Sequence, residues 1–99
     1  MKKPVAVTPQ HAESLAVQAL TFIAAEPERL GRFLDLSGIG PADIRTAARD
    51  SQFLAGVLEH VTGDEALLVT FAGEAGIDPA MIVNACEVLV GRTWERDVP

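Results

Sequence analysis

The stretch DSQFLAGVLEHVTGDEALLVTFAGEAG, residues 50–76, decides the fold class of this chain. On both sides of its central Gly-Asp junction, apolar residues recur at i, i+3, i+4 and i+7, which is the period of an amphipathic helix. Two helices are therefore predicted, over about 51–61 and 64–75, with Gly76 ending the second. Their apolar positions are Phe53, Leu54, Val57, Leu58 and Val61 in the first, and Leu67, Leu68, Phe71, Ala72 and Ala75 in the second.

The ends of these two helices are marked by capping residues. Asp50 or Ser51 is expected to cap the first helix, because short polar side chains accept hydrogen bonds from unpaired backbone N–H groups. The junction that follows has two interpretations. Either Gly63 closes the first helix, or Thr62 and Glu65 form a capping box for the second.

Proline just after a possible capping residue marks the starts of the other helices. The prolines in question are Pro9, Pro27, Pro41 and Pro79, which suit the first helical turn, where a missing N–H costs nothing. The predicted helices run over about 8–25, 27–37, 41–49 and 78–90, which with the two above makes six. Gly38 is predicted to end the second helix in the left-handed conformation, and Gly91 to follow the last.

The whole chain is therefore predicted to form one all-α domain, a compact bundle of about five to six short helices spanning 1–99. An ordered core is expected over about 8–91, with a flexible N-terminus and a loose tail over 92–99. Trp94 is the exception in that tail, since a lone Trp often docks on a helix groove. No internal repeat, strand alternation or linker divides the sequence.

The first predicted helix is apolar around much of its circumference, which is typical of a central helix. Other helices carry more apolar side chains than short helices readily cover, notably Phe33, Leu36 and Phe53. A surplus of this kind indicates contact with another protein or with a second copy of the chain.

Acidic charge is concentrated in the second half of the chain. The net charge is −6. Residues 51–99 hold only two basic residues, Arg92 and Arg96, against eight acidic ones, whereas residues 1–50 are balanced. No Lys or Arg lies between Arg49 and Arg92, a gap that disfavours phosphate backbones and anionic lipids. The acidity favours a basic protein partner, with no membrane as partner.

A cytoplasmic location is expected. The single cysteine, Cys86, cannot form an intramolecular disulfide, as suits a reducing compartment. Polar residues and prolines interrupt the start of the chain, where an export signal would need a continuous apolar region. No apolar run reaches the roughly 18 residues of a membrane span.

The segment Leu36-Ser37-Gly38-Ile39-Gly40-Pro41 resembles the hairpin of helix-hairpin-helix proteins, which bind DNA backbones. In that family a Gly-hydrophobic-Gly turn lets backbone N–H groups approach a phosphate. Here Ala42 and Asp43 follow the turn in place of the usual Lys or Thr, and a carboxylate repels phosphate. A glycine-capped turn between helices is the favoured interpretation.

A second segment, Phe71 to Ile82, is similar to a helix-turn-helix, in which small residues let two helices cross closely. Its second helix would present Asp78, Met81, Asn84 and Glu87, none of them basic, although DNA readers depend on Lys and Arg. Packing explains the same residues, and this interpretation is preferred.

No catalytic centre is expected, and the chain is not predicted to be an enzyme. The usual nucleophile or base candidates are His11, His60 and Cys86. The two histidines fall at helix ends, and Cys86 falls among apolar residues that raise a thiol pKa. No zinc spacing, phosphate loop or triad is present, so no cofactor or metal is expected.

From about Ala12 to Gly91 the chain resembles a family of short bacterial proteins known only as a domain of unknown function, number 3572. The segments that carry the resemblance are 15–20, 27–34, 37–45 and 64–68. It implies a compact helical fold and no particular activity, ligand or partner.

Two functions compete. The first is a non-catalytic protein-interaction or adaptor module that binds another protein or itself. The alternative is nucleic-acid-backbone binding through the Gly38-Ile39-Gly40 turn, assisted by arginines, although nucleic acid is not the favoured partner. The candidate interaction residues for the two are Arg29, Arg32, Phe33, Gly38, Ile39, Gly40, Arg45 and Arg49.

Overall fold

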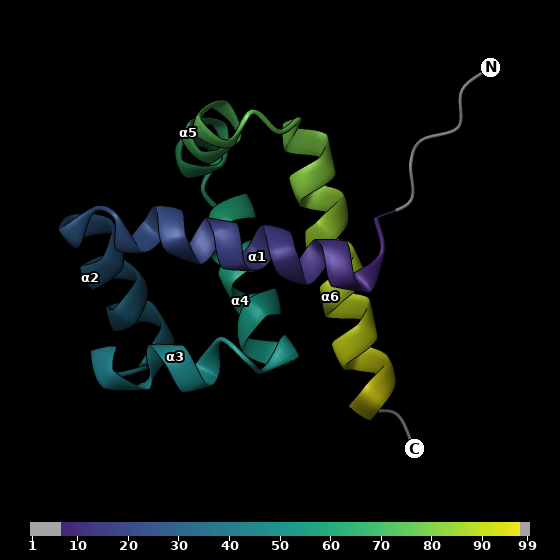
Figure 1. Cartoon of the computed structure of the whole chain (residues 1–99), viewed down its shortest axis with the longest axis horizontal. Coiled ribbons are helices and arrows are strands. Elements are labelled where there is room, and N and C mark those ends of the chain that lie inside the picture. The colour runs from purple at the N-terminus through teal and green to yellow at the C-terminus, as the bar shows by residue number, and fades with distance from the viewer. Residues whose placement is uncertain (1–6, 98–99) are drawn as a thin grey trace.

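The computed structural model describes residues 7–97, and this range contains helices and turns with no strand. Figure 1 shows the arrangement of the helices. They are α1 (Pro9–Ala24), α2 (Pro27–Ser37), the 3₁₀ helix η1 (Pro41–Asp43), α3 (Ile44–Ala47), α4 (Ser51–Thr62), α5 (Glu65–Ala75) and α6 (Pro79–Asp97). The predicted all-α fold and its helix order are confirmed.

Short polar side chains cap the starts of α1, α4 and α5. Thr8 Oγ1 accepts from the His11 N–H at 3.1 Å, and Asp50 Oδ1 accepts from the Gln52 N–H at 2.9 Å. Asp50 is thus the N-cap of α4, and Ser51 is its first helical residue. Each cap satisfies a backbone donor that has no partner inside the helix.

The junction between α4 and α5 follows the first sequence interpretation, in which Gly63 closes the earlier helix. Gly63 is the C-cap of α4, in the right-handed region at φ −78°. The N-cap of α5 is Asp64, whose Oδ1 accepts from the Leu67 N–H at 3.2 Å. The predicted box with Thr62 as cap does not form, because Thr62 is the last residue of α4.

Two helices end on a glycine in the left-handed region. Gly38, at φ 74°, follows α2, and its N–H donates to the Leu34 carbonyl. Gly76, at φ 67°, follows α5 in the same way. The prediction for Gly38 is confirmed, and its physical basis is that residues with a Cβ are strained at such angles.

The core forms where α1, α4 and α6 pack against one another. Figure 1 shows α1 crossing both of the other helices. Helix α2 packs on α1, and α5 packs on α4 and α6. The largest fully buried side chains are Phe71, Leu15, Ile23, Leu58, Ile82, Leu89, Val57 and Val61. Helix α1 is therefore central, as predicted, although Val17 on it is exposed.

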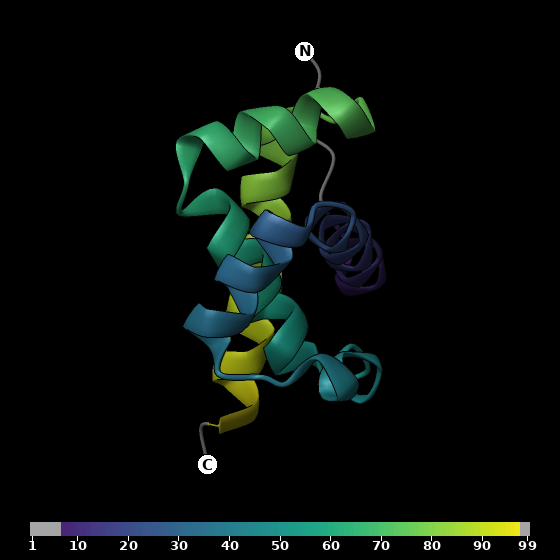
Figure 2. The same cartoon turned by 90° about the vertical axis from the view of Figure 1, so that its left-hand side faces the viewer.

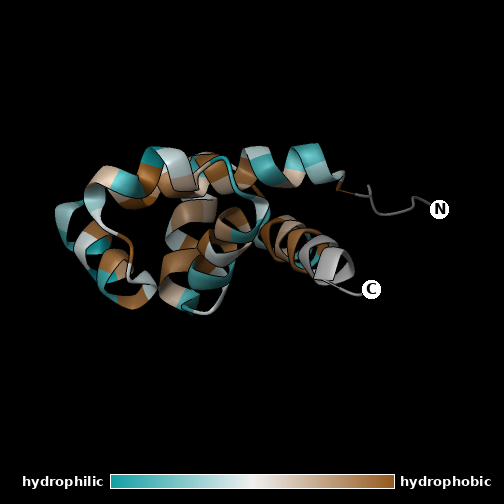
Figure 3. Ribbon diagram, turned by 90° about the horizontal axis from the view of Figure 1, so that it is seen from below, coloured by the Kyte–Doolittle hydropathy of each residue, from teal (hydrophilic) through white to brown (hydrophobic). Residues whose placement is uncertain are grey.

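The molecule is flat, with extents of 45 × 38 × 18 Å. A helix with its side chains is about 10 Å across, so the short dimension accommodates about two layers of helices. Figure 2 shows this thin edge-on profile. Hydrophobic residues, brown in Figure 3, alternate with hydrophilic ones along each helix. So thin a body leaves some apolar side chains with cover on one side only.

The bounds predicted for two helices differ from the structure. Helix α6 continues past Gly91 to Asp97, because glycine within a helix weakens it without ending it when the backbone bonds continue. The predicted third helix is divided into η1 and α3, and it ends at Ala47. In α6 the apolar residue Val83 is 37% exposed, whereas Ala85 is buried. The side chain of Trp94 and the residues beyond Asp97 lie outside the described part of the chain.

Between residues 7 and 97, no single helix has both the length and the apolar character needed to cross a membrane. Helix α5 and residues 79–91 of α6 have the required length and apolar character only when they are counted together. The axes of these two segments are bent by 109° relative to each other. This is the segment similar to a helix-turn-helix. Asp78, Asn84 and Glu87 are exposed on its second helix.

Candidate functional site

The residues that sequence analysis selected around Phe33 lie beside an apolar hollow between α2 and α4. We call it the Phe33 hollow. Its volume is about 390 Å³. It is lined by Phe33, Leu36, Ser37 and Ile39 from α2 and the following turn, and by Phe53, Gly56, Glu59 and His60 from α4.

Aromatic contacts hold the walls of the Phe33 hollow. The Phe33 ring is buried and stands edge-on to Phe53, with 5.8 Å between ring centroids and 72° between planes. It makes a similar contact with His60, at 5.1 Å and 71°. Edge-on geometry is the arrangement that ring quadrupoles favour. Phe33 therefore fixes the spacing between α2 and α4.

A missing side chain opens the space between these rings. Phe53, Gly56 and His60 are spaced three and four residues apart, so they share one face of α4. A Cβ added to Gly56 would meet nothing within 4 Å. A larger residue here would fill the hollow, so Gly56 accounts for part of its volume.

Leu36 lies at the border of the Phe33 hollow and is 69% exposed. It is the most exposed large hydrophobic residue in the described part of the chain. This exposure agrees with the expectation that the short helices leave Leu36 without full cover. Leu36 lies near the end of α2, a helix that packs on α1 and whose buried residue is Phe33.

His60 adds a titratable group to the Phe33 hollow. Burial lowers the pKa of its imidazole below 6.5, and the positive charge of Arg32 lowers this pKa further, while Asp64 partly opposes both. The neutral form is favoured near neutral pH, so His60 faces the hollow as an uncharged aromatic wall. Glu59 is exposed and is the lining residue that carries a full charge.

The structure divides the eight sequence-predicted residues among different surroundings. Phe33 and Ile39 line the hollow, and Gly38 and Gly40 flank Ile39. The Arg29 guanidinium lies 3.9 Å from the centroid of the Phe22 ring on α1, and 3.7 Å from Glu26. The positive charge of Arg32 lowers the pKa of His60, which lies on α4. Arg45 and Arg49 are exposed.

The Gly38-Ile39-Gly40 turn departs from a phosphate-binding hairpin in several ways. The Gly38 N–H donates to Leu34 O at 2.9 Å, and the Ile39 N–H donates to Ser37 Oγ at 3.3 Å. Those two donors already have acceptors. Gly40 caps only the short η1, and a Cβ on Gly40 would lie 3.5 Å from Asp43 Oδ2. A phosphate approaching Gly40 would meet that carboxylate.

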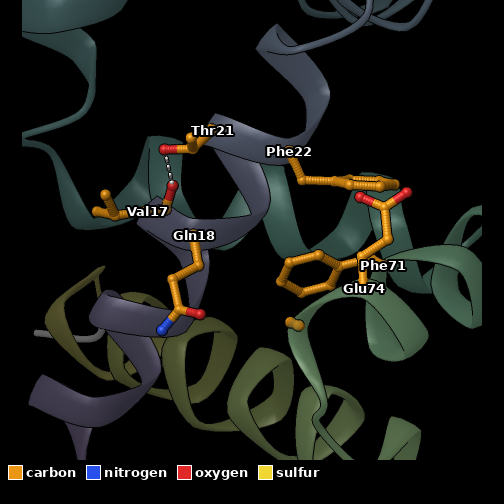
Figure 4. Close-up of a pocket in the computed structure, with 7 residues that line it drawn as sticks. Val17, Gln18, Thr21, Phe22, Phe71 and Glu74 are labelled. Atoms are coloured by element: carbon orange, nitrogen blue, oxygen red, sulfur yellow. Dashed lines mark hydrogen bonds between the residues drawn. The ribbon is translucent and has the colours of Figure 1, made fainter.

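A second hollow, between α1 and α5, was missed by sequence reasoning. We call it the Phe22 hollow. Its volume is about 350 Å³, and its lining residues are Val17, Gln18, Thr21, Phe22, Phe71, Glu74 and Ala75. Figure 4 shows Phe22 and Gln18 extending from α1, and Phe71 and Glu74 from α5, around this space. Phe22 and Phe71 are far apart in sequence, and apolar periodicity marked each of them for burial alone.

The groups considered for catalysis remain apart in the structure. Cys86 is buried, and this burial raises the pKa of its thiol; Thr62 donates a hydrogen bond to Sγ at 3.8 Å that partly opposes the shift. His11 is exposed in the first turn of α1. Among residues 7–91, whose side chains the structure describes, no three His, Cys, Asp or Glu side chains gather closely enough to hold a metal ion.

Comparison with known proteins finds a family model that covers most of the chain. A family model described as "Protein of unknown function (DUF3572)" matches residues 9–92, most of the chain. No curated protein and no solved structure matches the sequence or the fold.

Proposed function

The chain belongs to the DUF3572 family of proteins of unknown function, and we propose that it is a non-catalytic module that binds another protein through the Phe33 hollow. The observation that carries this proposal is Leu36, a leucine 69% exposed at the edge of an apolar hollow of about 390 Å³. An apolar rim beside an apolar space supports contact with an apolar partner residue.

The size and walls of the Phe33 hollow support a side chain from a partner helix as its occupant. Amphipathic helices bind in hydrophobic grooves through a few apolar anchors. Such anchors carry most of the binding energy when aromatic and aliphatic walls exclude water around them. Phe33 and Phe53 supply the aromatic walls, and Leu36 adds an aliphatic one.

We propose a reducing compartment, the cytoplasm, as the place where the module acts. The lone Cys86 is buried and free, which suits a compartment where thiols stay reduced. The absence of a catalytic role is part of the same proposal, supported by the separate positions of His11, His60 and Cys86 in the fold.

Site-specific photo-crosslinking tests the proposal in the native host. A photoreactive phenylalanine analogue replaces Leu36 in one variant and Val69 in another, since Val69 is also exposed, at 58%, but lies on α5 away from the hollow. We expect a discrete crosslinked protein from position 36 and none from position 69. Equal crosslinking at both positions, or none at 36, would contradict the proposal.

A variant that fills the Phe33 hollow tests whether partner binding needs the open space. Gly56→Leu puts a side chain into the open space in the Phe33 hollow, and Gly73→Leu adds the same side chain at an exposed position of α5 with open space around it. We expect Gly56→Leu to weaken binding of the crosslinked partner at least about tenfold and Gly73→Leu to leave it unchanged. Sedimentation velocity shows whether the partner is a second copy of the chain or a different protein.

A further inference from the structure

The Phe22 hollow differs from the Phe33 hollow in its charge. Its walls are the rings of Phe22 and Phe71, with centroids 5.2 Å apart and planes at 46°, together with Val17 and Ala75. Glu74 is its charged lining residue, and Glu74 is exposed. Figure 4 shows this carboxylate on the same side of the hollow as the Phe22 ring. An aromatic wall with one carboxylate is suited to a cation that has an apolar stem.

Glu74 is the charged group among the polar residues that line the hollow, which also include Gln18 and Thr21. The Thr21 hydroxyl donates to Val17 O at 3.0 Å and is thereby engaged. No described Lys, Arg or His nitrogen lies within 4 Å of the Glu74 carboxylate. The chain has no Lys or Arg between Arg49 and Arg92, so the segment that bears Glu74 supplies no cation of its own.

The Phe22 ring already contacts a cationic side chain of this protein, that of Arg29. The Arg29 guanidinium lies 3.9 Å from its centroid, a geometry in which the ring quadrupole attracts positive charge. Arg29 does not line the hollow, and Glu26, 3.7 Å away, offsets its charge. The internal pair shows the kind of contact that these aromatic side chains make.

We propose that the Phe22 hollow binds the side chain of a lysine or arginine that a partner protein presents among apolar residues. The alkyl stem would lie against Phe22 and Phe71, and the charged end would reach Glu74. The volume of about 350 Å³ accommodates one such side chain with part of its neighbour. This site is separate from the Phe33 hollow and can be tested independently of it.

Charge complementarity favours a different protein over the other possible occupants. Nucleic acid carries phosphates, which Glu74 repels. A second copy of the chain has a net charge of −6, and the arginines that are exposed among its described side chains stand close in sequence to aspartates: Arg32 to Asp35, Arg45 to Asp43 and Arg49 to Asp50. A copy presenting any of these arginines would bring a carboxylate toward Glu74.

The binding chemistry is tested with n-butylammonium, which has the four-carbon stem and ammonium group of lysine. The full-length ¹⁵N-labelled protein is titrated with it in two-dimensional NMR, and 1-butanol serves as the uncharged control. We expect n-butylammonium to shift the backbone signals of Val17, Gln18 and Glu74 at millimolar concentrations, with at least fivefold tighter binding than 1-butanol. Equal binding of the two, or shifts confined to other residues, would overturn the proposal.

Two charge variants assign the effect to the hollow. Glu74→Gln removes the carboxylate from the hollow, and Glu65→Gln removes another exposed carboxylate from α5 outside it. We expect Glu74→Gln to abolish the preference for n-butylammonium and Glu65→Gln to retain it, with unchanged circular dichroism in both. If the preference persists in Glu74→Gln, the proposal is wrong. In a separate experiment, a photoreactive residue in place of Val17 identifies the partner by crosslinking. The crosslinked segment of that partner must contain Lys or Arg between apolar residues.

Discussion

The imidazole of His60 stands edge-on to the buried ring of Phe33, with 5.1 Å between the ring centroids. This contact links the end of α4 to α2 and forms one wall of the Phe33 hollow. Because burial and Arg32 lower the pKa of His60, the folded protein binds a proton there less readily than the unfolded chain. The contribution of neutral His60 to the free energy of unfolding is therefore complete above a pH of about 6.5. This contribution is lost as the pH falls through the pKa of His60 in the folded protein.

A histidine variant tests this pH dependence. We expect urea denaturation midpoints of the wild-type protein to fall more steeply between about pH 7.5 and 5 than those of His60→Gln, which cannot gain the proton. His11→Gln is the control, since His11 is exposed in α1. Identical slopes for wild type and His60→Gln would show that His60 does not couple folding to pH.

The left-handed glycine after α2 predicts a stability difference between glycine sites. Gly38→Val is expected to lower the free energy of unfolding by more than about 1 kcal/mol, because a branched residue is strained at φ 74°. No atom lies within 4 Å of the added Cβ, so the cost comes from the backbone and not from a clash. Chemical denaturation measures it, and an unchanged midpoint would contradict the C-cap assignment.

Two controls accompany the Gly38 variant. Gly31 lies within α2 and has open space around it, so Gly31→Ala should stabilise the protein by about 0.5–1 kcal/mol through helix propensity. Arg45 is exposed on α3, and Arg45→Ala should change the free energy of unfolding by less than about 0.5 kcal/mol. The opposite signs at the two glycines separate backbone conformation from residue type.

Leucine truncations distinguish the core from the edge of the Phe33 hollow. Leu58 in α4 is fully buried, so Leu58→Ala is expected to cost about 2–5 kcal/mol through lost burial and a residual cavity. Leu36→Ala should cost less than about 0.5 kcal/mol, because its side chain is mostly exposed. Thermal and chemical denaturation measure both values. A large cost at Leu36 would mean that it contributes to the fold, and would weaken its role as a contact residue.

The thiol of Cys86 is expected to react slowly in the folded protein. Burial raises its pKa, so little thiolate is present near neutral pH, and the side chain is only 8% exposed. Labelling by a disulfide reagent near pH 7.5 should be at least about tenfold slower in native protein than in concentrated urea. Similar rates in the two conditions would indicate that α6 opens readily around this residue.

Duplex DNA provides a test of the alternative function. We expect no mobility shift of a labelled duplex at about 50 mM salt, where phosphate-driven binding is strong. The reason is that the Gly38 and Ile39 N–H groups already donate within the turn and that the Asp43 carboxylate lies close to Gly40. A shift that Gly40→Asp abolishes would instead support binding through the turn.

The sequence by itself determined the local structure of this protein. Apolar periodicity and the Thr8-Pro9, Asp50 and Gly38 signals located the helices, because caps and left-handed glycines depend on neighbouring residues. Gly91 shows the limit of such signals. It was expected to end the last helix, but it lies within α6, since glycine is also tolerated inside a helix.

Only the tertiary structure decided which apolar residues stay exposed and which surfaces meet. Periodicity marks a side of a helix as apolar but does not say how much of that side a neighbour covers, so Leu36 and Phe33 looked alike in sequence. Phe33 is buried and contacts Phe53 and His60 of α4, whereas Leu36, three residues further along α2, stays 69% exposed. In the same way, Phe22 and Phe71 form the walls of one hollow only because α1 and α5 are brought together by packing on α4 and α6.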